Sequence, residues 1–455
     1  MKKFQTILLI IFGVGALFAV MVFAGYIPTP TKKSAFKGSG TVVVWGTIND
    51  PNFIGYMNDL SDGITNFKIR YVPKNPETYE SELIESFADG TAPDLFFVDN
   101  GSISRFSEQI DPIPYSVMSQ KTFLNSYAPA FSLFLSKKGT LAYPFLIDPM
   151  VLYYNKTLLV NEGIVNPPTY WDELNTLSEK LTKRDPTGSF VQSTISFGRF
   201  ENNTHAKDIM SLLLLQVGNP IVGINNDGYY VSTLGTHKTD QGLSLPAVTT
   251  FFTDFASPDK FVYSWNKSLP DATSSFLTER VAFYVGFSSE LFALQAKNPN
   301  LSLAISEIPQ PRGIKTKKTY ANLTGIAMSK NSTNKQTAML AVQTIASPGH
   351  STQIGKILAL PPVYASDLKA ATDPALAYQS IFQISALRAS SWFDPNKKET
   401  NLIFRELSQS ILAGGADADG AYEKANSSLE FLLSGLNGKT QNTTTSQTTT
   451  DITKP

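Results

Sequence analysis

The residues that could perform catalysis in this sequence are few, and their spacing matches no known catalytic motif. The three histidines, His205, His237 and His350, are far apart along the chain. We interpret each of them as a surface or helix-capping side chain rather than a catalytic base. The chain has no cysteine, which excludes a cysteine nucleophile, a disulfide, an iron–sulfur cluster and a cysteine-based zinc site. The serine-nucleophile motif G-x-S-x-G and the zinc motif H-E-x-x-H are also missing from the sequence.

The glycines do not form a phosphate-binding loop. Residues 349–356, GHSTQIGK, contain one residue more than a P-loop, and Ile357 follows where Ser or Thr is required. The Gly-x-Gly pairs lie outside the strand-to-helix turn that a dinucleotide site needs. Carboxylate pairs of the kind used in glycoside hydrolysis remain open, because only their separation in the fold identifies them. We predict no catalytic residue, no cofactor and no metal site.

The charge balance limits the partners that the chain could bind. Of its 455 residues, 38 are Lys or Arg and 38 are Asp or Glu, so the formal net charge is zero. Nucleic-acid binding relies on clustered Lys and Arg, and no basic stripe is visible in the sequence. Charged residues make up 17%, which is low for a globular protein. We therefore expect no nucleic-acid partner, and a surface that is polar but largely uncharged.

Both ends of the chain differ in composition from its middle. Residues 7–27 form an uncharged apolar run that would be about 30 Å long as a helix, the thickness of one hydrocarbon core. We predict that residues 1–36 are an uncleaved transmembrane anchor and a linker. A cleavable signal peptide is the alternative, because residues 22–24, VFA, resemble a small-residue cleavage site. At the other end, residues 437–455 are rich in Thr, Asn and Gln and predict a disordered tail.

The middle of the chain begins with alternating strand and helix signals. Short apolar runs at residues 41–45, 67–72 and 94–98 are typical of buried strands. Between the second and third runs, residues 79–87 carry an apolar stripe at helical spacing, and Gly90 stands where a left-handed helix end belongs. Strand, helix and strand in this order predict an α/β fold with a parallel sheet.

A series of short motifs runs through the middle of the chain. They are TVVVW at 41–45, GTAPDLFFVD at 90–99, LAYP at 141–144 followed by Asp148, LYYNK at 152–156, PPTYWDEL at 167–174, FLTERVAF at 276–283 and IPQP at 308–311. Their order resembles that of one known family, the extracellular solute-binding proteins, family 1, of ABC importers, to which maltose-binding protein belongs. The likeness covers nearly the whole chain between the two ends.

The resemblance implies a two-lobed, periplasmic-binding-protein-like (type II) fold with a hinge and an interlobe cleft over residues 37–436. The N-lobe would hold about residues 40–146 plus 301–357, and the C-lobe about residues 147–300 plus 358–436. The hinge would lie near Pro144–Asp148, Asn300 and Leu360. Many family members are lipid-anchored through a cysteine, which this chain lacks. We therefore expect its own N-terminal helix to hold it at the extracytoplasmic face of the cell membrane.

The function that the resemblance implies is that of the substrate-binding component of an ABC importer. Such a protein captures a carbohydrate, here expected to be an oligosaccharide, by closure of its lobes and delivers it to a membrane permease. It is not an enzyme, and we expect a monomer. Two alternatives remain open: an extracytoplasmic glycan-active hydrolase, and a surface carbohydrate-binding protein without a role in transport.

The candidate ligand-binding residues are polar or aromatic side chains that the resemblance places around the cleft. Carboxylates and amides bind sugar hydroxyls, and aromatic rings cover the apolar face of a sugar. For Trp45 and Trp392 packing in the core is the alternative, and for Asp50 it is helix capping. The N-lobe and hinge candidates are Trp45, Asn49, Asp50, Asp99, Asn100, Ser102 and Asp148. The remaining candidates are Trp265, Phe287, Ser288, Ser289, Tyr320, Asn322 and Trp392.

Overall fold

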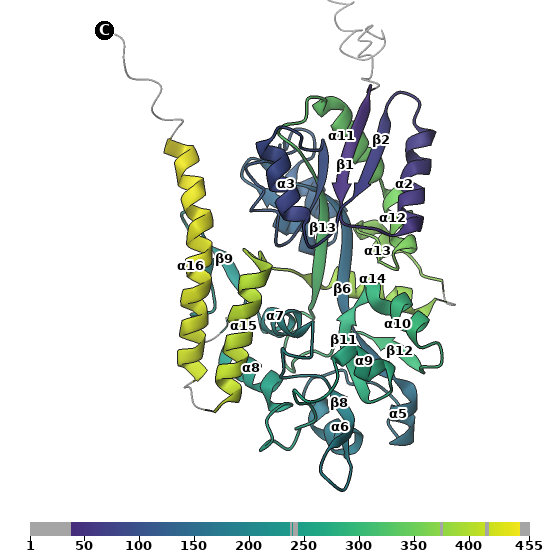
Figure 1. Ribbon diagram of the computed structural model, residues 1–455, viewed down its shortest axis with the longest axis vertical. Coiled ribbons are helices and arrows are strands. Elements are labelled where there is room, and N and C mark those ends of the chain that lie inside the picture. Colours follow the sequence, from purple (N-terminus) through teal and green to yellow (C-terminus); the bar gives the residue numbers. More distant parts are fainter. Residues whose placement is uncertain (1–37, 237–238, 240–243, 374–375, 415–417, 446–455) are drawn as a thin grey trace, which may run out of the picture.

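The computed structural model describes residues 38–236, 239, 244–373, 376–414 and 418–445 (Figure 1). Side chains are described only up to residue 437. The predicted membrane anchor lies outside the described residues. Within the described ranges, no helix combines the length and the apolar character needed to cross a bilayer.

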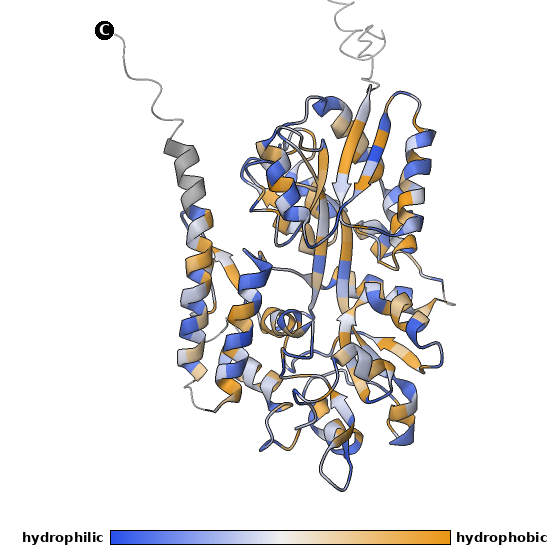
Figure 2. Ribbon diagram, in the orientation of Figure 1, coloured by the Kyte–Doolittle hydropathy of each residue, from blue (hydrophilic) through white to orange (hydrophobic). Residues whose placement is uncertain are grey.

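One continuous sheet of ten strands runs through the whole molecule. Its path is β2-β1-β3-β13-β6-β11-β8-β7, with β12 added against β6 and β14 against β13. Strand β1 is mostly hydrophobic, as its orange colouring shows (Figure 2). The strands are β1 (Thr41–Gly46), β2 (Lys68–Pro73), β3 (Leu95–Asp99), β6 (Tyr143–Asn155), β7 (Lys183–Arg184), β8 (Phe190–Ile195), β11 (Val281–Phe287), β12 (Leu303–Ser306), β13 (Thr319–Met328) and β14 (Ala389–Ser390).

The predicted strand–helix–strand unit near the N-terminus is confirmed. Strands β1, β2 and β3 pair in parallel, and α3 (Tyr79–Ala88) connects β2 to β3. Tyr79 and Leu83 of this helix are buried, and Gly90 has φ +70° just after its end. A side chain at that φ would be strained, so glycine suits the position.

The hydrophobic core of the described residues consists of three clusters, one in the N-lobe and two in the C-lobe. In the N-lobe, one cluster combines residues from β1, β3, the first part of β6 and the second part of β13. Its helical segments are α2 (Pro51–Gly63), α3, α4 (Gln120–Ser126), η1 (Pro129–Phe134), α11 (Lys335–Ile345), α12 (Pro348–Ile357) and α13 (Ala365–Leu368). The short strands β4 (Leu135–Ser136) and β5 (Gly139–Thr140) form a hairpin there.

The C-lobe is built around two further clusters on either face of β6 and β11. Its helical segments are α5 (Lys156–Asn161), α6 (Glu173–Leu181), α7 (Ala206–Gln216), α8 (Leu245–Asp254), α9 (Ala272–Leu277), η2 (Ser288–Glu290), α10 (Leu291–Lys297), α15 (Lys397–Leu412) and α16 (Ala418–Thr445). A hairpin of β9 (Val222–Ile224) and β10 (Tyr230–Ser232) packs against α16. The helix α14 (Ala377–Leu387) lies across the waist between the lobes (Figure 1).

The chain passes between the lobes at three places, and core membership locates each of them. Ile147 belongs to the N-lobe cluster and Met150 to a C-lobe cluster, so the first passage is inside β6. The second passage is at the start of β13, between Tyr320 and Ala321. The third lies between Leu368 of the N-lobe cluster and Trp392 of a C-lobe cluster, and α14 between them contributes Phe382 to a C-lobe cluster and Ala386 to the N-lobe cluster.

Two of the predicted hinge positions and the corresponding lobe boundaries differ from the structure. Residues 301–320, assigned to the N-lobe from the sequence, lie in the C-lobe, because β12 pairs with the C-lobe half of β6. Val363 and Leu368, assigned to the C-lobe, pack in the N-lobe core. The second passage therefore lies near residue 320 and the third between residues 368 and 392, and not near Asn300 and Leu360. The first hinge, at Pro144–Asp148, is where the structure also has a passage.

The C-terminal prediction also needs correction. The tail was expected to be disordered from residue 437, but α16 runs from Ala418 to Thr445. Leu429 and Leu433 of this helix are fully buried against the C-lobe. Residues 446–455 lie outside the described residues.

Candidate functional site

A cavity of about 560 Å³ opens beside the waist, on the C-lobe side. The strand directions explain its position. Because β6 leads from the N-lobe into the C-lobe and β11 is antiparallel to it, β11 and its parallel neighbour β8 end facing the N-lobe. Ligand sites in α/β sheets lie beyond such carboxyl ends. The cavity is lined by Asp148, Thr204, His205, Asp208, Thr273, Phe287, Ser289, Glu290, Ala293, Leu294, Lys297 and Asn322.

Two cavity residues belong to the strands that connect the lobes. Asp148 of β6 and Asn322 of β13 are directly opposite each other in the antiparallel pair. Opposite residues of such a pair project from the same face of the sheet. A ligand held by these two side chains would therefore be in direct contact with two of the three interlobe passages.

Asp148 is held by the turn that follows β11. Its carboxylate accepts hydrogen bonds from the hydroxyl of Ser288 (2.8 Å), the backbone N–H of Ser289 (3.0 Å) and the hydroxyl of Ser289 (2.6 Å). Burial raises the pKa of Asp148 from 3.8 to about 6, because these three donors only partly replace lost water. The carboxyl group is thus fixed in place and faces the cavity.

Two carboxylates flank the side chain of His205 at the cavity. The imidazole Nε2 lies 2.9 Å from Oε1 of Glu290, and Nδ1 lies 3.9 Å from Oδ2 of Asp208. Burial opposes the charged imidazole, but attraction by the carboxylates of Asp208 and Glu290, together with the close contact to Glu290, outweighs it and raises the pKa of His205 to about 10. The side chain is therefore an imidazolium ion at neutral pH.

Glu290 is fully engaged by its surroundings. Besides His205, its carboxylate accepts from the hydroxyl of Tyr284 (2.6 Å) and from the backbone N–H of Phe287 (2.7 Å). Burial works against the carboxylate, yet these contacts and His205 lower its pKa. The ring of Phe287 meets the imidazole edge to face, with 5.2 Å between the ring centroids. Glu290 therefore positions the histidine and the aromatic wall of the cavity together.

The structure brings together part of the predicted site. Four predicted residues line the cavity: Asp148, Phe287, Ser289 and Asn322. A fifth, Ser288, is buried and donates to Asp148. These five come from three segments that are far apart in sequence, and their grouping depends on β6, β11 and β13 being neighbours in the sheet.

Two more predicted residues form a buried network behind the cavity. Tyr320 donates from its hydroxyl to the amide oxygen of Asn322 (3.3 Å). The amide of Asn100 donates to the hydroxyl of Tyr320 (3.4 Å) and to the backbone oxygen of Trp392 (3.3 Å). Asn100 and Tyr320 thus join the end of β3 to two interlobe passages rather than face the cavity.

The other N-lobe candidates do not line the cavity. Asp50 caps α2 by accepting from the N–H groups of Asn52 and Phe53, both at 2.9 Å, as the capping alternative predicts. Asn49 precedes it and is exposed. Trp45 is partly buried, and the ammonium of Lys74 lies 3.7 Å from the centre of its ring.

Asp99 and Ser102 have structural partners in the turn after β3. Asp99 accepts from the N–H groups of Gly101 and Ser102, both at 2.8 Å, and from the ammonium of Lys397 at 2.6 Å. Ser102 is buried, and its hydroxyl accepts from the N–H of Asp99. Short polar side chains at a strand end satisfy the turn that follows, and this use explains both residues.

Two tryptophans expected at the ligand are buried in the core. Trp265 is fully buried, and its indole N–H donates to Asn202 (2.9 Å). Trp392 is 2% exposed and donates to Ser211 (3.1 Å). For Trp392 this is the packed alternative that the sequence left open. Both predictions of a ligand contact are therefore corrected, because neither ring reaches the cavity wall.

The sequence analysis missed several cavity residues. They are Thr204, His205, Asp208, Thr273, Glu290 and Lys297. His205 was interpreted as a surface or capping side chain, whereas it lines the cavity. The spacing His-x-x-Asp at the start of α7 was the available signal, since residues three apart share a helix face. Of the other histidines, His350 bonds the hydroxyl of Tyr56 (2.6 Å), and His237 lies outside the described residues.

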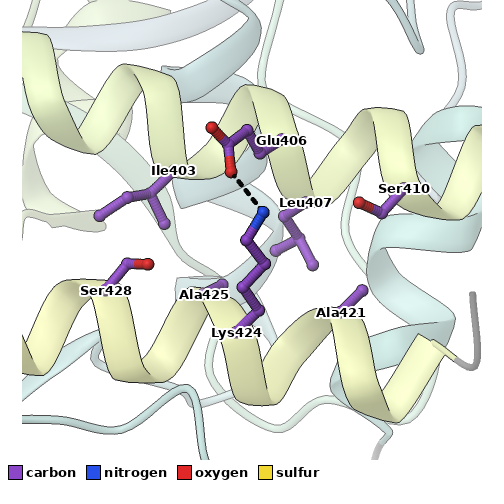
Figure 3. Close-up of a pocket in the computed structure, with 8 residues that line it drawn as sticks. All are labelled: Ile403, Glu406, Leu407, Ser410, Ala421, Lys424, Ala425 and Ser428. Atoms are coloured by element: carbon purple, nitrogen blue, oxygen red, sulfur yellow. Dashed lines mark ion pairs between the residues drawn. The ribbon is translucent and has the colours of Figure 1, made fainter.

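A small hollow between α15 and α16 differs from this site in kind. Its volume is about 10 Å³, which is no more than one water molecule needs. Figure 3 shows Glu406 and Lys424 facing each other across it, 2.9 Å apart, between apolar side chains of the two helices. The hollow is a seam of helix packing and not a ligand site. No three His, Asp or Glu side chains of the described ranges are grouped to hold a metal.

Comparison with known proteins shows which family this chain belongs to and which solved structures share its fold. A family model described as bacterial extracellular solute-binding protein matches residues 61–377. A protein of Brucella abortus (strain 2308), named provisionally as a binding protein, is 24% identical over 268 residues, which are 56% of this chain and 59% of the relative. The chain thus spans about 59% of the length of the curated relatives it matches.

Solved structures share the fold at low sequence identity. The sugar-binding protein MalE from Xanthomonas citri is 16% identical with a TM-score of 0.71, over 88% of this chain and 99% of that one. The cyclic α-maltosyl-1,6-maltose binding protein from Arthrobacter globiformis is 17% identical with a TM-score of 0.70, over 87% and 99%. The GacH receptor of Streptomyces glaucescens is 17% identical with a TM-score of 0.65, over 87% and 99%. The two-lobed solute-binding fold is therefore shown.

Proposed function

Because this chain belongs to the family of bacterial extracellular solute-binding proteins, we propose that it captures a carbohydrate for an ABC importer. The ligand would be an oligosaccharide that the closing lobes enclose and that a membrane permease then receives. The solved relatives support a sugar as ligand, since they include the sugar-binding MalE and the GacH receptor in complex with acarbose. The protein binds and releases its ligand without changing it.

The observation that carries this proposal is the position of the cavity at the waist. Asp148 and Asn322 lie on the two long strands that join the lobes, and both face the cavity. A ligand that contacts them together with residues of both lobes binds the closed state better than the open one, and so shifts the population toward closure.

The lining suits a neutral polyhydroxylated molecule. Carboxylate, amide and hydroxyl groups of Asp148, Asn322 and Ser289 offer donors and acceptors to sugar hydroxyls, and Phe287 offers an apolar ring. We propose these four residues as ligand contacts, supported by Ser288. From the N-lobe, closure would add side chains near the ends of β1 and β3. The candidates there that are not buried are Trp45, Asn49, Asp50 and Asp99.

We further propose that residues 7–27 hold the protein at the extracytoplasmic face of the membrane as a single helix, and that it acts as a monomer. The uncharged run of these residues supports the anchor, and the family is an extracellular one. Membrane fractionation of cells that express the chain tests this part. The anchor proposal is contradicted if the protein is recovered in the soluble extracytoplasmic fraction.

The binding proposal is tested with the purified protein and a panel of oligosaccharides. We expect at least one sugar to raise the melting temperature and to decrease the radius of gyration in small-angle X-ray scattering. Asp148→Ala should weaken that binding about tenfold or more, because it removes an acceptor in the cavity. Asp227→Ala, in the exposed β9–β10 turn, is the control and should bind as wild type does.

Two results would contradict the binding proposal. One is a panel in which no sugar stabilises the protein. The other is release of reducing sugar by the purified protein, which would favour a glycan-active hydrolase instead. Binding to a polysaccharide without compaction in scattering would favour a surface carbohydrate-binding protein outside transport.

A further inference from the structure

The cavity contains one pair of opposite charges that is close together but not hydrogen-bonded. Nδ1 of His205 and Oδ2 of Asp208 are 3.9 Å apart, whereas an N–H···O bond requires about 3 Å. Both side chains line the cavity and are partly exposed to it, at 18% and 19%. At this separation, a single oxygen atom between Nδ1 and Oδ2 can lie at a normal hydrogen-bond distance from each of them.

We propose that His205 and Asp208 together bind a single hydroxyl group of an uncharged, polyhydroxylated ligand and thereby determine its specificity. This inference rests on the proposed function and names the residues that select the ligand class. In the bound state the hydroxyl oxygen accepts from Nδ1–H of His205, and the hydroxyl proton is donated to the carboxylate of Asp208.

The other contacts of His205 explain why Nδ1 is available for this role. Nε2 lies 2.9 Å from Oε1 of Glu290 and donates its proton to that carboxylate, so it is not available to a ligand. The imidazole is doubly protonated because two carboxylates flank it, and Nδ1 therefore carries a proton as well. Glu290 already accepts from three groups, one of them His205, which makes it a positioning residue for His205.

Asp208 differs from Glu290 in its unused capacity. Within the described ranges, its only recorded partner is His205, at 3.9 Å. A carboxylate can accept about four hydrogen bonds, so Asp208 keeps most of its acceptor sites for solvent or a ligand. Asp148, by comparison, already accepts three hydrogen bonds from Ser288 and Ser289.

The charged groups around the pair are of both signs. A carboxylate on the ligand would be repelled by Asp148, Asp208 and Glu290 and attracted by His205 and Lys297, and an ammonium group would meet the reverse, so neither charge has a uniformly favourable lining. A hydroxyl group accepts and donates at once, so it satisfies both members of the pair without bringing a charge. The ring of Phe287 next to the imidazole offers an apolar surface for the C–H groups beside that hydroxyl.

The test uses isothermal titration of the purified full chain with named probes. Maltotriose and mannobiose are the neutral probes, digalacturonic acid is the anionic probe and the disaccharide of glucosamine is the cationic probe. We expect a neutral probe to bind best. Asp208→Asn should lower its affinity about 10- to 100-fold, because the charge-assisted hydrogen bond is lost. Asp227→Asn makes the same chemical change at an exposed turn and should have no effect.

A second measurement separates a direct contact from a structural effect. The neutral probe that binds is compared with its monodeoxy analogues, each of which lacks one hydroxyl group. We expect wild type to bind one of these analogues weakly, with the same affinity that Asp208→Asn has for the parent sugar. Asp208→Asn should discriminate little between the parent sugar and that analogue. His205→Gln should behave in the same way, with its melting temperature measured separately to check that the variant is folded.

The outcomes distinguish this inference from the proposal on which it rests. If a neutral probe binds, and the folded Asp208→Asn and His205→Gln variants bind it within twofold of wild type, the inference is wrong and sugar binding stands. If an anionic or cationic probe binds best, the inference is also wrong. If none of the four probes binds, the sugar-binding proposal itself is contradicted.

Discussion

Replacing Asp148 by Asn should make the protein more stable at neutral pH. The amide oxygen can accept from the N–H of Ser289 and the hydroxyl of Ser288, as one carboxylate oxygen does now. The amide nitrogen can donate to the hydroxyl of Ser289, which rotates to accept. The variant therefore keeps the hydrogen bonds and loses only the buried charge.

The magnitude follows from the pKa of Asp148, about 6 in the folded protein against 3.8 ordinarily. Each pH unit between these values corresponds to about 1.4 kcal/mol, so ionising the folded protein costs about 3 kcal/mol at most. Between pH 3.8 and about 6 the folded state binds this proton and the unfolded chain does not. The free energy of unfolding of wild type therefore falls as the pH rises through that window.

Urea denaturation at a series of pH values measures the effect. The free energy of unfolding of Asp148→Asn minus that of wild type should increase by up to about 3 kcal/mol from about pH 4 to about pH 7 and then stay level. Subtracting wild type removes the contribution of all other titrating groups. Asp227→Asn is the matched control and should show no such increase. A difference that is flat with pH, or that decreases, would refute the reasoning.

Two further predictions concern the core and the waist. Lys207 is buried with its ammonium 2.6 Å from Asp394, so Lys207→Met should lower the free energy of unfolding in urea by about 3–5 kcal/mol. Adding Asp394→Leu should recover part of that loss, and a double variant less stable than the single one would contradict the argument. Trp45 is the one tryptophan of four that is not buried. Trp45→Phe should therefore abolish most of the fluorescence change on sugar binding, and an unchanged signal would assign it to a buried indole.

The local elements of this protein were predictable from short segments. The runs at residues 41–45, 67–72 and 94–98 became three paired strands, and the apolar stripe before Gly90 became α3. Local pattern suffices here, because the spacing of apolar residues within one segment sets which face of a helix or strand can be buried. The order of the motifs also indicated the two-lobed family, which the family match confirms.

The positions at which the chain passes between the lobes for the second and third time could not be predicted from local sequence pattern. Residues 301–320 were assigned to the N-lobe from the sequence, and the pairing of residues 303–306 with residues 152–155 decides that they belong to the C-lobe. The same limit applies to Trp265, since its residue type fits equally a sugar platform and a core. Only the packing around it, with Asn202 bonded to its indole, shows that it is buried.

The sequence by itself indicated the first strands and the helix between them, the family, and Asp148 as a candidate ligand contact. The tertiary structure alone decided which side chains stand beside that carboxylate. His205 and Glu290 are 85 residues apart, and they meet because β8 and β11 are parallel neighbours that end at the same edge of the sheet. A charge pair of this kind depends on distances between segments, and sequence spacing carries no information about such distances once the chain has crossed a sheet.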